Sequence, residues 1–86
     1  MRSSITKSFR TEFDSLPRAI QLLAYKNYLL WRKQPSHPSL HFKPIGPYWS
    51  VRVGRTYRSL GREKDGCLYW FWIGHHKRYD ELIKRS

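Results

Sequence analysis

The sequence predicts one α+β domain, spanning residues 1–86, in which an N-terminal helical hairpin packs on a roughly four-stranded antiparallel sheet and a short helix follows. Three observations lead to this fold class. The chain of 86 residues has room for one core. Its apolar residues recur at helical spacing up to about residue 33 and then alternate with a period of two. Because helices and strands occupy separate blocks, the helices should cover one face of the sheet.

Two helices are predicted in the N-terminal part. Ile5, Phe9 and Phe13 recur every four positions, which predicts a first helix over residues 4–15. Pro17 suits the first turn of a second helix, since its missing N–H is not needed there. Apolar residues at helical spacing continue this second helix to about Lys33.

The remaining segments predict a meander of strands. The prolines in QPSHPSL end the second helix, because the residue before a proline is held extended. LHFKPI, YWSVRV, YRSLGRE and CLYWFWI are the predicted strands. Residues 54–56 form a tight connection, Asp65 and Gly66 form a hairpin turn, and RYDELIKR forms the short C-terminal helix.

The last predicted strand is apolar on both faces. Regular alternation gives two sets, Tyr69, Phe71 and Ile73 on one face and Leu68, Trp70 and Trp72 on the other. A single layer of two helices covers only one face of a sheet. The other face should therefore be covered by the C-terminal tail or by another molecule, which favours a protein partner.

Charge is the strongest signal of the whole chain. Seventeen Lys and Arg against six Asp and Glu give a net charge of +11, and no acidic residue lies between Asp14 and Glu63. Such a field attracts polyanions, so the expected ligand is nucleic acid, the ribosome or an acidic protein. The alternative is a solvated basic surface without a ligand.

Several classes of protein do not fit the sequence. One cysteine, Cys67, makes neither an intramolecular disulfide nor a C-x-x-C zinc site. The N-terminus lacks the apolar core of a signal peptide, and no apolar run approaches the ~20 residues that span a bilayer. We therefore expect a cytoplasmic protein without membrane contact, metal or cofactor.

Two arginines on neighbouring strands are the first candidate site residues. If residues 54–56 are the whole connection, Arg52 and Arg58 lie opposite each other on one face. Two guanidiniums side by side repel each other unless an anion bridges them, and phosphate fits their forks. The alternative is a pair of solvated arginines on an exposed sheet face.

Two histidines and a tyrosine follow the apolar strand. His75 and His76 come directly after Gly74, and Tyr79 lies three residues further on. Neighbours at a strand exit point in different directions, so at most one histidine should face a given site. Histidine gives or takes a proton near neutral pH. Together with the arginines, this set suits metal-independent RNA cleavage, in which the ribose 2′-OH attacks the adjacent phosphate.

Four segments, LPRAIQLLA, PSHPSLHFKPI, WSVRVGRTYRSLG and YWFWIGHHKRYDELI, resemble in this order the RelE/ParE superfamily of bacterial type II toxins. The resemblance covers residues 9–83. It implies a toxin that is neutralised by an acidic antitoxin wrapped around its basic surface. RelE-like members cleave messenger RNA in the ribosome, whereas ParE-like members poison DNA gyrase. The family's N-terminal strand is not expected here, because helical spacing begins almost at Met1.

The resemblance also implies roles for single residues. Arg58 matches the arginine that holds the scissile phosphate, and Arg52 matches a cationic position on the preceding strand. His76 matches a position that is basic in RelE and a proton-transferring histidine in several relatives. Tyr79 roughly matches the C-terminal aromatic residue, although it comes early in the sequence. The paired lysines of RelE are absent, and Ser50 and Arg52 stand near their places.

The resulting hypothesis is a ribosome-dependent, metal-independent mRNA endoribonuclease. Arg58 and Arg52 bind the phosphate, His76 transfers a proton with His75 in reserve, and Tyr79 stacks on or orients the substrate. Five cations are expected to contact RNA or the ribosome: Lys26, Arg32, Lys33, Lys43 and Arg55. The alternatives are a ParE-like gyrase inhibitor and a non-catalytic basic nucleic-acid-binding module. Gyrase-poisoning members generally lack the histidine and tyrosine at the strand exit, which favours the nuclease.

Overall fold

The computed structural model describes residues 2–84, and it has the α+β architecture that the sequence predicts. The elements follow one another as β1 (Arg2–Ile5), α1 (Lys7–Asp14), α2 (Arg18–Lys33), a short 3₁₀ helix η1 (Pro38–Leu40), β2 (Lys43–Ile45), β3 (Tyr48–Val53), β4 (Tyr57–Lys64), β5 (Cys67–His75) and α3 (His76–Lys84). No helix in the described part of the chain is long and apolar enough to cross a membrane.

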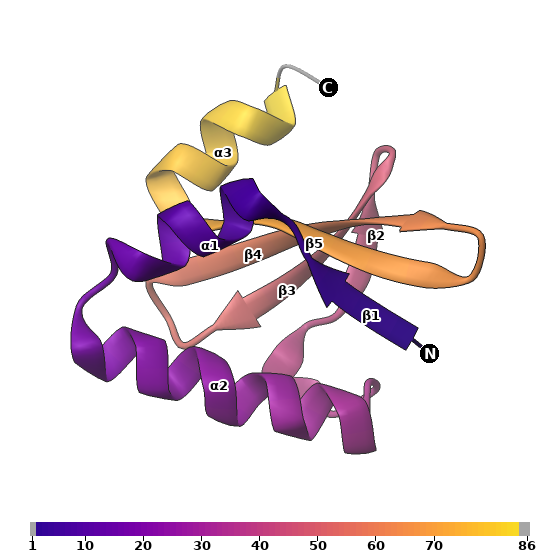
Figure 1. The fold of residues 1–86 in the computed structure, drawn as a ribbon, viewed down its shortest axis with the longest axis horizontal. Coiled ribbons are helices and arrows are strands. Elements are labelled where there is room, and N and C mark those ends of the chain that lie inside the picture. Colours follow the sequence, from indigo (N-terminus) through magenta and orange to yellow (C-terminus); the bar gives the residue numbers. More distant parts are fainter. Residues whose placement is uncertain (1, 85–86) are drawn as a thin grey trace.

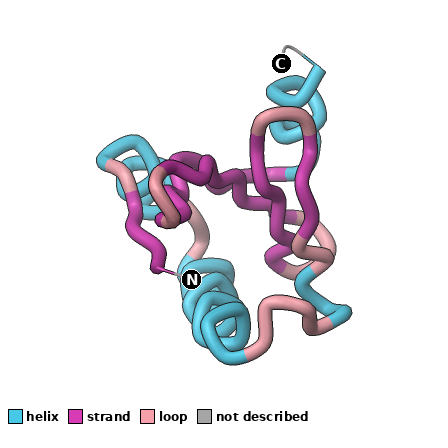
Figure 2. Tube along the Cα trace, turned by 90° about the vertical axis from the view of Figure 1, so that its right-hand side faces the viewer, coloured by secondary structure: helices cyan, strands magenta, loops and turns pink. Residues whose placement is uncertain are grey.

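The strands form one sheet in the order β1-β5-β4-β3-β2, antiparallel except for the parallel pair of β1 and β5. The helices α2 and α3 lie on opposite sides of this sheet (Figure 1). In the view of Figure 2, α2 is seen nearly end-on and the twisted strands arch over it. The two faces of the sheet therefore have different neighbours, and only one of them meets the long helix.

Strand β1 was not predicted, and the sheet has five strands rather than roughly four. The predicted helix over residues 4–15 begins three residues late, because Thr6 starts it. The Thr6 Oγ1 accepts a hydrogen bond from the Phe9 N–H at 3.1 Å, which is an N-cap. The Thr6 N–H still donates to the Trp70 carbonyl at 3.0 Å, as a strand residue would. Ile5 thus belongs to the edge strand, where it is 41% exposed.

The predicted alternation along the last strand is wrong beyond Phe71. Gly61 pairs with Trp70 whereas Leu60 pairs with Trp72, so Phe71 is an extra residue in a β-bulge. After a bulge of one residue, each later side chain lies on the opposite face from the one that regular alternation predicts, because side chains alternate with a period of two.

The bulge changes which apolar residues are buried together. Leu68, Trp70 and Ile73 are buried on the side of α2, whereas regular alternation would put Ile73 on the other face. Phe71 and Trp72, consecutive in sequence, both face away from α2. The face away from α2 therefore gains a second large aromatic ring at the bulge.

The core lies between α2 and the sheet. Trp31 of α2 is 2% exposed and packs edge-on against Trp70 with ring centroids 5.4 Å apart. Leu40 from η1, Val51 from β3 and Leu68 from β5 complete the buried cluster. The layer is not closed, since a groove of about 590 Å³ runs between α2 on one side and β1 with α1 on the other. The groove leaves part of the apolar sheet face accessible.

The turns that set strand register follow the predictions. Asp65 and Gly66 have φ angles of 52° and 77°, so both central residues of the β4–β5 hairpin adopt the left-handed region, as a type I′ turn requires. The β3–β4 connection consists of residues 54–56. Gly54 has a φ of 66°, and a Cβ there would approach Leu23 Cδ2 to 2.8 Å. The backbone of this connection therefore lies directly against α2.

Candidate active site

Arg52 and Arg58 are cross-strand partners in the β3–β4 ladder, which confirms the register that the three-residue connection predicts. They lie on the face of the sheet away from α2, since Val51 and Val53, their alternating neighbours on β3, line the groove beside that helix. Directly opposed residues of an antiparallel pair have Cβ atoms about 4.5–5.5 Å apart. The two positive charges are therefore adjacent.

The two guanidiniums differ in how they are held. The Arg58 Nη1 donates to three backbone carbonyls at the end of the hairpin: Tyr57 at 2.8 Å, Arg55 at 3.2 Å and Gly54 at 3.5 Å. The Arg52 Nε is buried and has no hydrogen-bond partner among residues 2–84. A buried N–H without an acceptor is costly, so an oxygen-bearing anion beside Arg52 would satisfy it.

The electrostatics of the pair favour an anion as well. Burial, and secondly the positive charge of Arg52, lower the pKa of Arg58 below its ordinary value. Tyr79 and Asp80 act in the opposite direction, which also shows that α3 lies near this arginine. A guanidinium remains charged in proteins, so the repulsion persists until a negative group binds between the two side chains.

His75 and His76 lie at the same end of the sheet, beside the β3–β4 connection. The His76 N–H donates to the Thr56 carbonyl at 2.8 Å, which ties the start of α3 to that connection. The His75 Nδ1 accepts from the Lys77 N–H at 3.2 Å and so caps the helix. The two imidazoles stack with centroids 4.5 Å apart. In the described part of the chain, the His76 ring has no hydrogen bond and keeps both nitrogens available.

Tyr79 is buried in the contact between α3 and the sheet. It is 8% exposed, and its hydroxyl oxygen accepts a hydrogen bond from the Ser50 Oγ at 3.0 Å. In this conformation the tyrosine ring fixes α3 on β3, and it would reach a substrate base only if α3 moved.

Replacing Tyr79 by alanine is expected to lower the free energy of unfolding by about 3–5 kcal/mol, the range for loss of a large buried ring. Tyr79→Phe keeps the ring and is expected to cost only about 1 kcal/mol, for one hydrogen bond. Urea titration followed by tryptophan fluorescence measures both. A loss below about 1 kcal/mol in the alanine variant would contradict the structural role of the ring, given that a buried aromatic is removed.

The five cations predicted to contact RNA are all exposed but do not form one surface. Lys26, Arg32 and Lys33 lie on α2, across the sheet from the arginine pair. Lys43 lies on the edge strand β2. Only Arg55, in the β3–β4 connection, lies beside Arg58, which donates to its carbonyl.

Two residues on the face of the arginine pair were not among the predicted site residues. Tyr48 lies on β3 and Arg62 on β4, and each is four positions from one member of the pair. Their parity along the strands could have identified them, since residues separated by an even number share a face. Residues 2–84 bring no three His, Cys, Asp or Glu side chains together in a way that could hold a metal ion.

Comparisons with known proteins find similarity in the fold of solved structures. No family model and no curated protein sequence matches the chain. Among solved structures, the chain resembles the RelB–RelE antitoxin–toxin complex of Methanococcus jannaschii, with a TM-score of 0.71, 18% identity, and coverage of 91% of this chain and 95% of that one.

Two further structures are similar. The YoeB/ParE toxin of Agrobacterium tumefaciens matches with a TM-score of 0.68 and 16% identity over 88% of this chain and 99% of that one. The isolated RelE toxin of E. coli matches with a TM-score of 0.63 and 13% identity over 98% and 96%. The architecture expected from the sequence resemblance is thereby confirmed: the chain has the fold of the RelE, YoeB and ParE toxins.

Proposed function

We propose that this protein is the toxin of a type II toxin–antitoxin pair and that it cleaves messenger RNA in the translating ribosome without a metal ion. The observation that carries the proposal is the cross-strand pair of Arg52 and Arg58, at the end of the sheet where His76 begins α3. The Nε of Arg52 is buried there and has no hydrogen-bond partner among residues 2–84. The likeness in fold to RelE toxins supports it.

In the proposed reaction the ribose 2′-oxygen forms a bond with the adjacent phosphorus, and the bond between phosphorus and the 5′-oxygen breaks. The products are a 2′,3′-cyclic phosphate and a 5′-hydroxyl end. One proton leaves the 2′-OH and one reaches the 5′-oxygen, and the imidazole of His76 transfers one of them. The guanidiniums of Arg52 and Arg58 stabilise the charge that builds on the non-bridging oxygens.

The test is to add the purified protein to a cell-free translation reaction and map new 5′ ends on the message. We expect cuts within the coding sequence that require ribosomes, and no cuts in a ribosome-free control. Intact message with undiminished translation would refute the proposal. A gyrase supercoiling assay would then test the ParE-like alternative.

An acidic antitoxin is the proposed protein partner. The apolar groove beside α2 and the exposed Leu22 and Leu29 on that helix would be covered by an amphipathic segment. Lys26, Arg32 and Lys33 on α2 would attract its carboxylates. Slower amide hydrogen exchange along α2 in the complex than in the free protein would support this assignment, and unchanged exchange would contradict it.

A further inference from the structure

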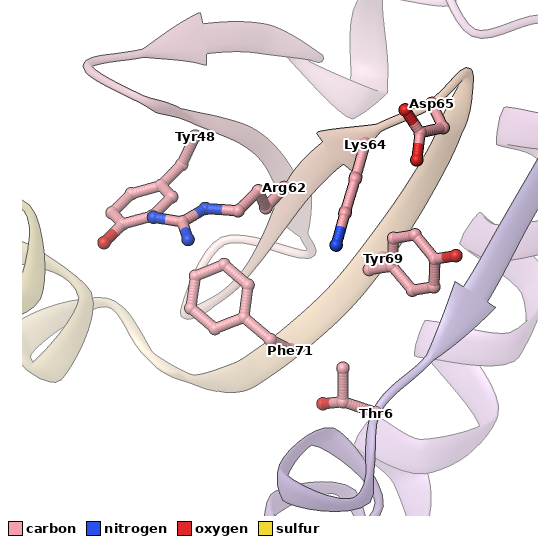
Figure 3. A pocket seen from close by; sticks show the side chains of 7 residues that line it. All are labelled: Thr6, Tyr48, Arg62, Lys64, Asp65, Tyr69 and Phe71. Atoms are coloured by element: carbon pink, nitrogen blue, oxygen red, sulfur yellow. The ribbon is translucent and has the colours of Figure 1, made fainter.

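A second set of side chains lies on the same face of the sheet as the arginine pair. Tyr48, Arg62, Tyr69 and Phe71 line a pocket of about 630 Å³ that opens away from α2. Figure 3 shows Tyr48, Arg62 and Phe71 near one another and Tyr69 on the other side of Lys64. We call these four residues the aromatic platform. Helix α3 covers the sheet near Ser50 and leaves the platform accessible.

The platform combines flat rings with positive charge. The Tyr48 and Phe71 rings have centroids 5.2 Å apart and are tilted by 58°. The Arg62 guanidinium carbon lies 5.4 Å from the Tyr48 ring centroid, in cation–π contact. Tyr69 is 39% exposed, so its ring lies open to solvent on a sheet face. Lys64 and Asp65 lie at the rim, and their charges cancel, so Arg62 gives the pocket a net charge of +1.

A hydrogen bond at the β5 bulge helps to hold Phe71 in this place. The extra residue of a bulge has no partner in the ladder, so its carbonyl needs another donor. The donor is the Ser8 Oγ of α1, which lies 2.9 Å from the Phe71 carbonyl oxygen. The bulge is therefore fixed by a specific contact, and the position of the Phe71 ring does not depend on a ligand.

The platform lies on the same face of the sheet as the arginine pair, and the buried Ser50, in contact with Tyr79 of α3, lies between them. Tyr48 and Arg52 are four residues apart on β3, and so are Arg62 and Arg58 on β4, which corresponds to about 13 Å along the strands. Trp72 of β5 lies on this face as well, near the arginine pair. A Cβ on Gly74, the cross-strand partner of Arg58, would lie 2.6 Å from the Trp72 Cζ2, so the indole lies directly over that glycine.

We propose that the aromatic platform is a base-stacking subsite for single-stranded RNA on the same face of the sheet as the phosphate that Arg52 and Arg58 bind, an inference that rests on the proposed function. Exposed rings on a sheet face, interleaved with cations, are how proteins bind unpaired bases. The surface combines rings with cations in a protein of net charge +11, a combination that suits nucleobases with their phosphates. The proposal moves the base-stacking role from Tyr79, whose ring is buried, to this exposed surface.

The experiment measures base-dependent binding by the free protein at one fixed salt concentration. The probes are a fluorescently labelled oligoadenylate and an abasic oligomer of the same length and charge, followed by fluorescence anisotropy. Tyr69→Ala removes an exposed ring of the platform. Its matched control is Tyr25→Ala, which removes a 60% exposed tyrosine from α2 across the sheet. Tyr69→Trp keeps a stacking ring and serves as the rescue variant.

We expect Tyr69→Ala to weaken oligoadenylate binding by roughly 5- to 150-fold, the range for loss of one stacked base, and to leave abasic binding unchanged. Tyr69→Trp should restore binding, and Tyr25→Ala should bind as the wild type. The losses of binding free energy from removing the bases and from removing the ring should not be additive, because both changes delete the same interaction. Equal losses with both probes, or no loss with either, would overturn the inference.

The two proposals can fail separately. If the wild type cleaves message during translation while Tyr69→Ala binds oligoadenylate normally, the subsite is refuted and the nuclease stands. If base-dependent binding is lost in Tyr69→Ala but no message is cut, the subsite stands and the nuclease falls. If Tyr69→Ala changes only the affinity for a co-purified acidic protein, the platform is a protein interface and the inference is overturned.

Discussion

Replacing His76 by glutamine is expected to lower the rate of ribosome-dependent mRNA cleavage by about 100- to 10,000-fold, the contribution typical of a general acid or base. Glutamine keeps the polar character of the side chain but cannot transfer a proton at neutral pH. The fold should persist, because the structural contact of His76 is its backbone N–H to Thr56. The measurement is the rate at which new 5′ ends appear on the message.

His75→Asn is the matched control for this variant. Asparagine retains an acceptor that can cap α3 in place of the His75 Nδ1, so stability should be preserved. We expect cleavage close to that of the wild type. Loss of cleavage in His75→Asn with activity retained in His76→Gln would assign proton transfer to His75 instead. Growth arrest undiminished in both variants would favour gyrase inhibition.

Arg58→Met is expected to lower cleavage by about 100- to 1,000-fold, the range for loss of one group that stabilises transition-state charge. Methionine keeps the apolar stem of the side chain and removes the charged fork. The repulsion that lowers the pKa of Arg58 disappears with it. Relief of this repulsion offsets the loss of the hydrogen bonds from Arg58 to the hairpin carbonyls. We therefore expect a melting temperature close to that of the wild type, so the variant separates loss of activity from loss of fold.

Arg18→Met is the charge-matched comparison, since Arg18 is exposed at the start of α2. It lowers the net charge by the same amount and should leave cleavage unchanged. Arg58→Lys should recover only part of the activity, because an ammonium cannot grip two phosphate oxygens with a planar fork. Equal losses in Arg58→Met and Arg18→Met would mean that net charge alone is responsible and would refute the phosphate site.

The pairing of Arg52 with Arg58 could be predicted because it follows from local rules. The three-residue connection that begins with Gly54 fixes the register of β3 and β4, and the period of two along each strand puts both arginines on the same face. The Asp65-Gly66 turn was predictable for the same reason, since few residues accept a positive φ at both central positions. Local signals of this kind depend on a few neighbouring residues and survive in the folded chain.

The parts that escaped prediction depend on distant residues. Strand β1 contains one apolar residue, Ile5, and it forms because β5 offers a free edge. The bulge at Phe71 depends on the Ser8 hydroxyl, which lies 63 positions away in the sequence. The capping by Thr6 was a local signal that the spacing of Ile5 and Phe9 obscured. The burial of Tyr79 likewise depends on Ser50 of β3, in another part of the chain.

The parallel pairing of β1 with β5 also governs when the molecule can be completed. Arg2 pairs with Cys67 and Ile5 pairs with Trp70, so β1 can join the sheet only after β5 has been synthesised. Contacts between such distant segments form slowly, and a chain still being synthesised cannot make them. Arg52, Arg58 and His76 come together only with the same late strand and its following helix. A prematurely released fragment would therefore lack the proposed site, which forms only once β5 and α3 have been synthesised.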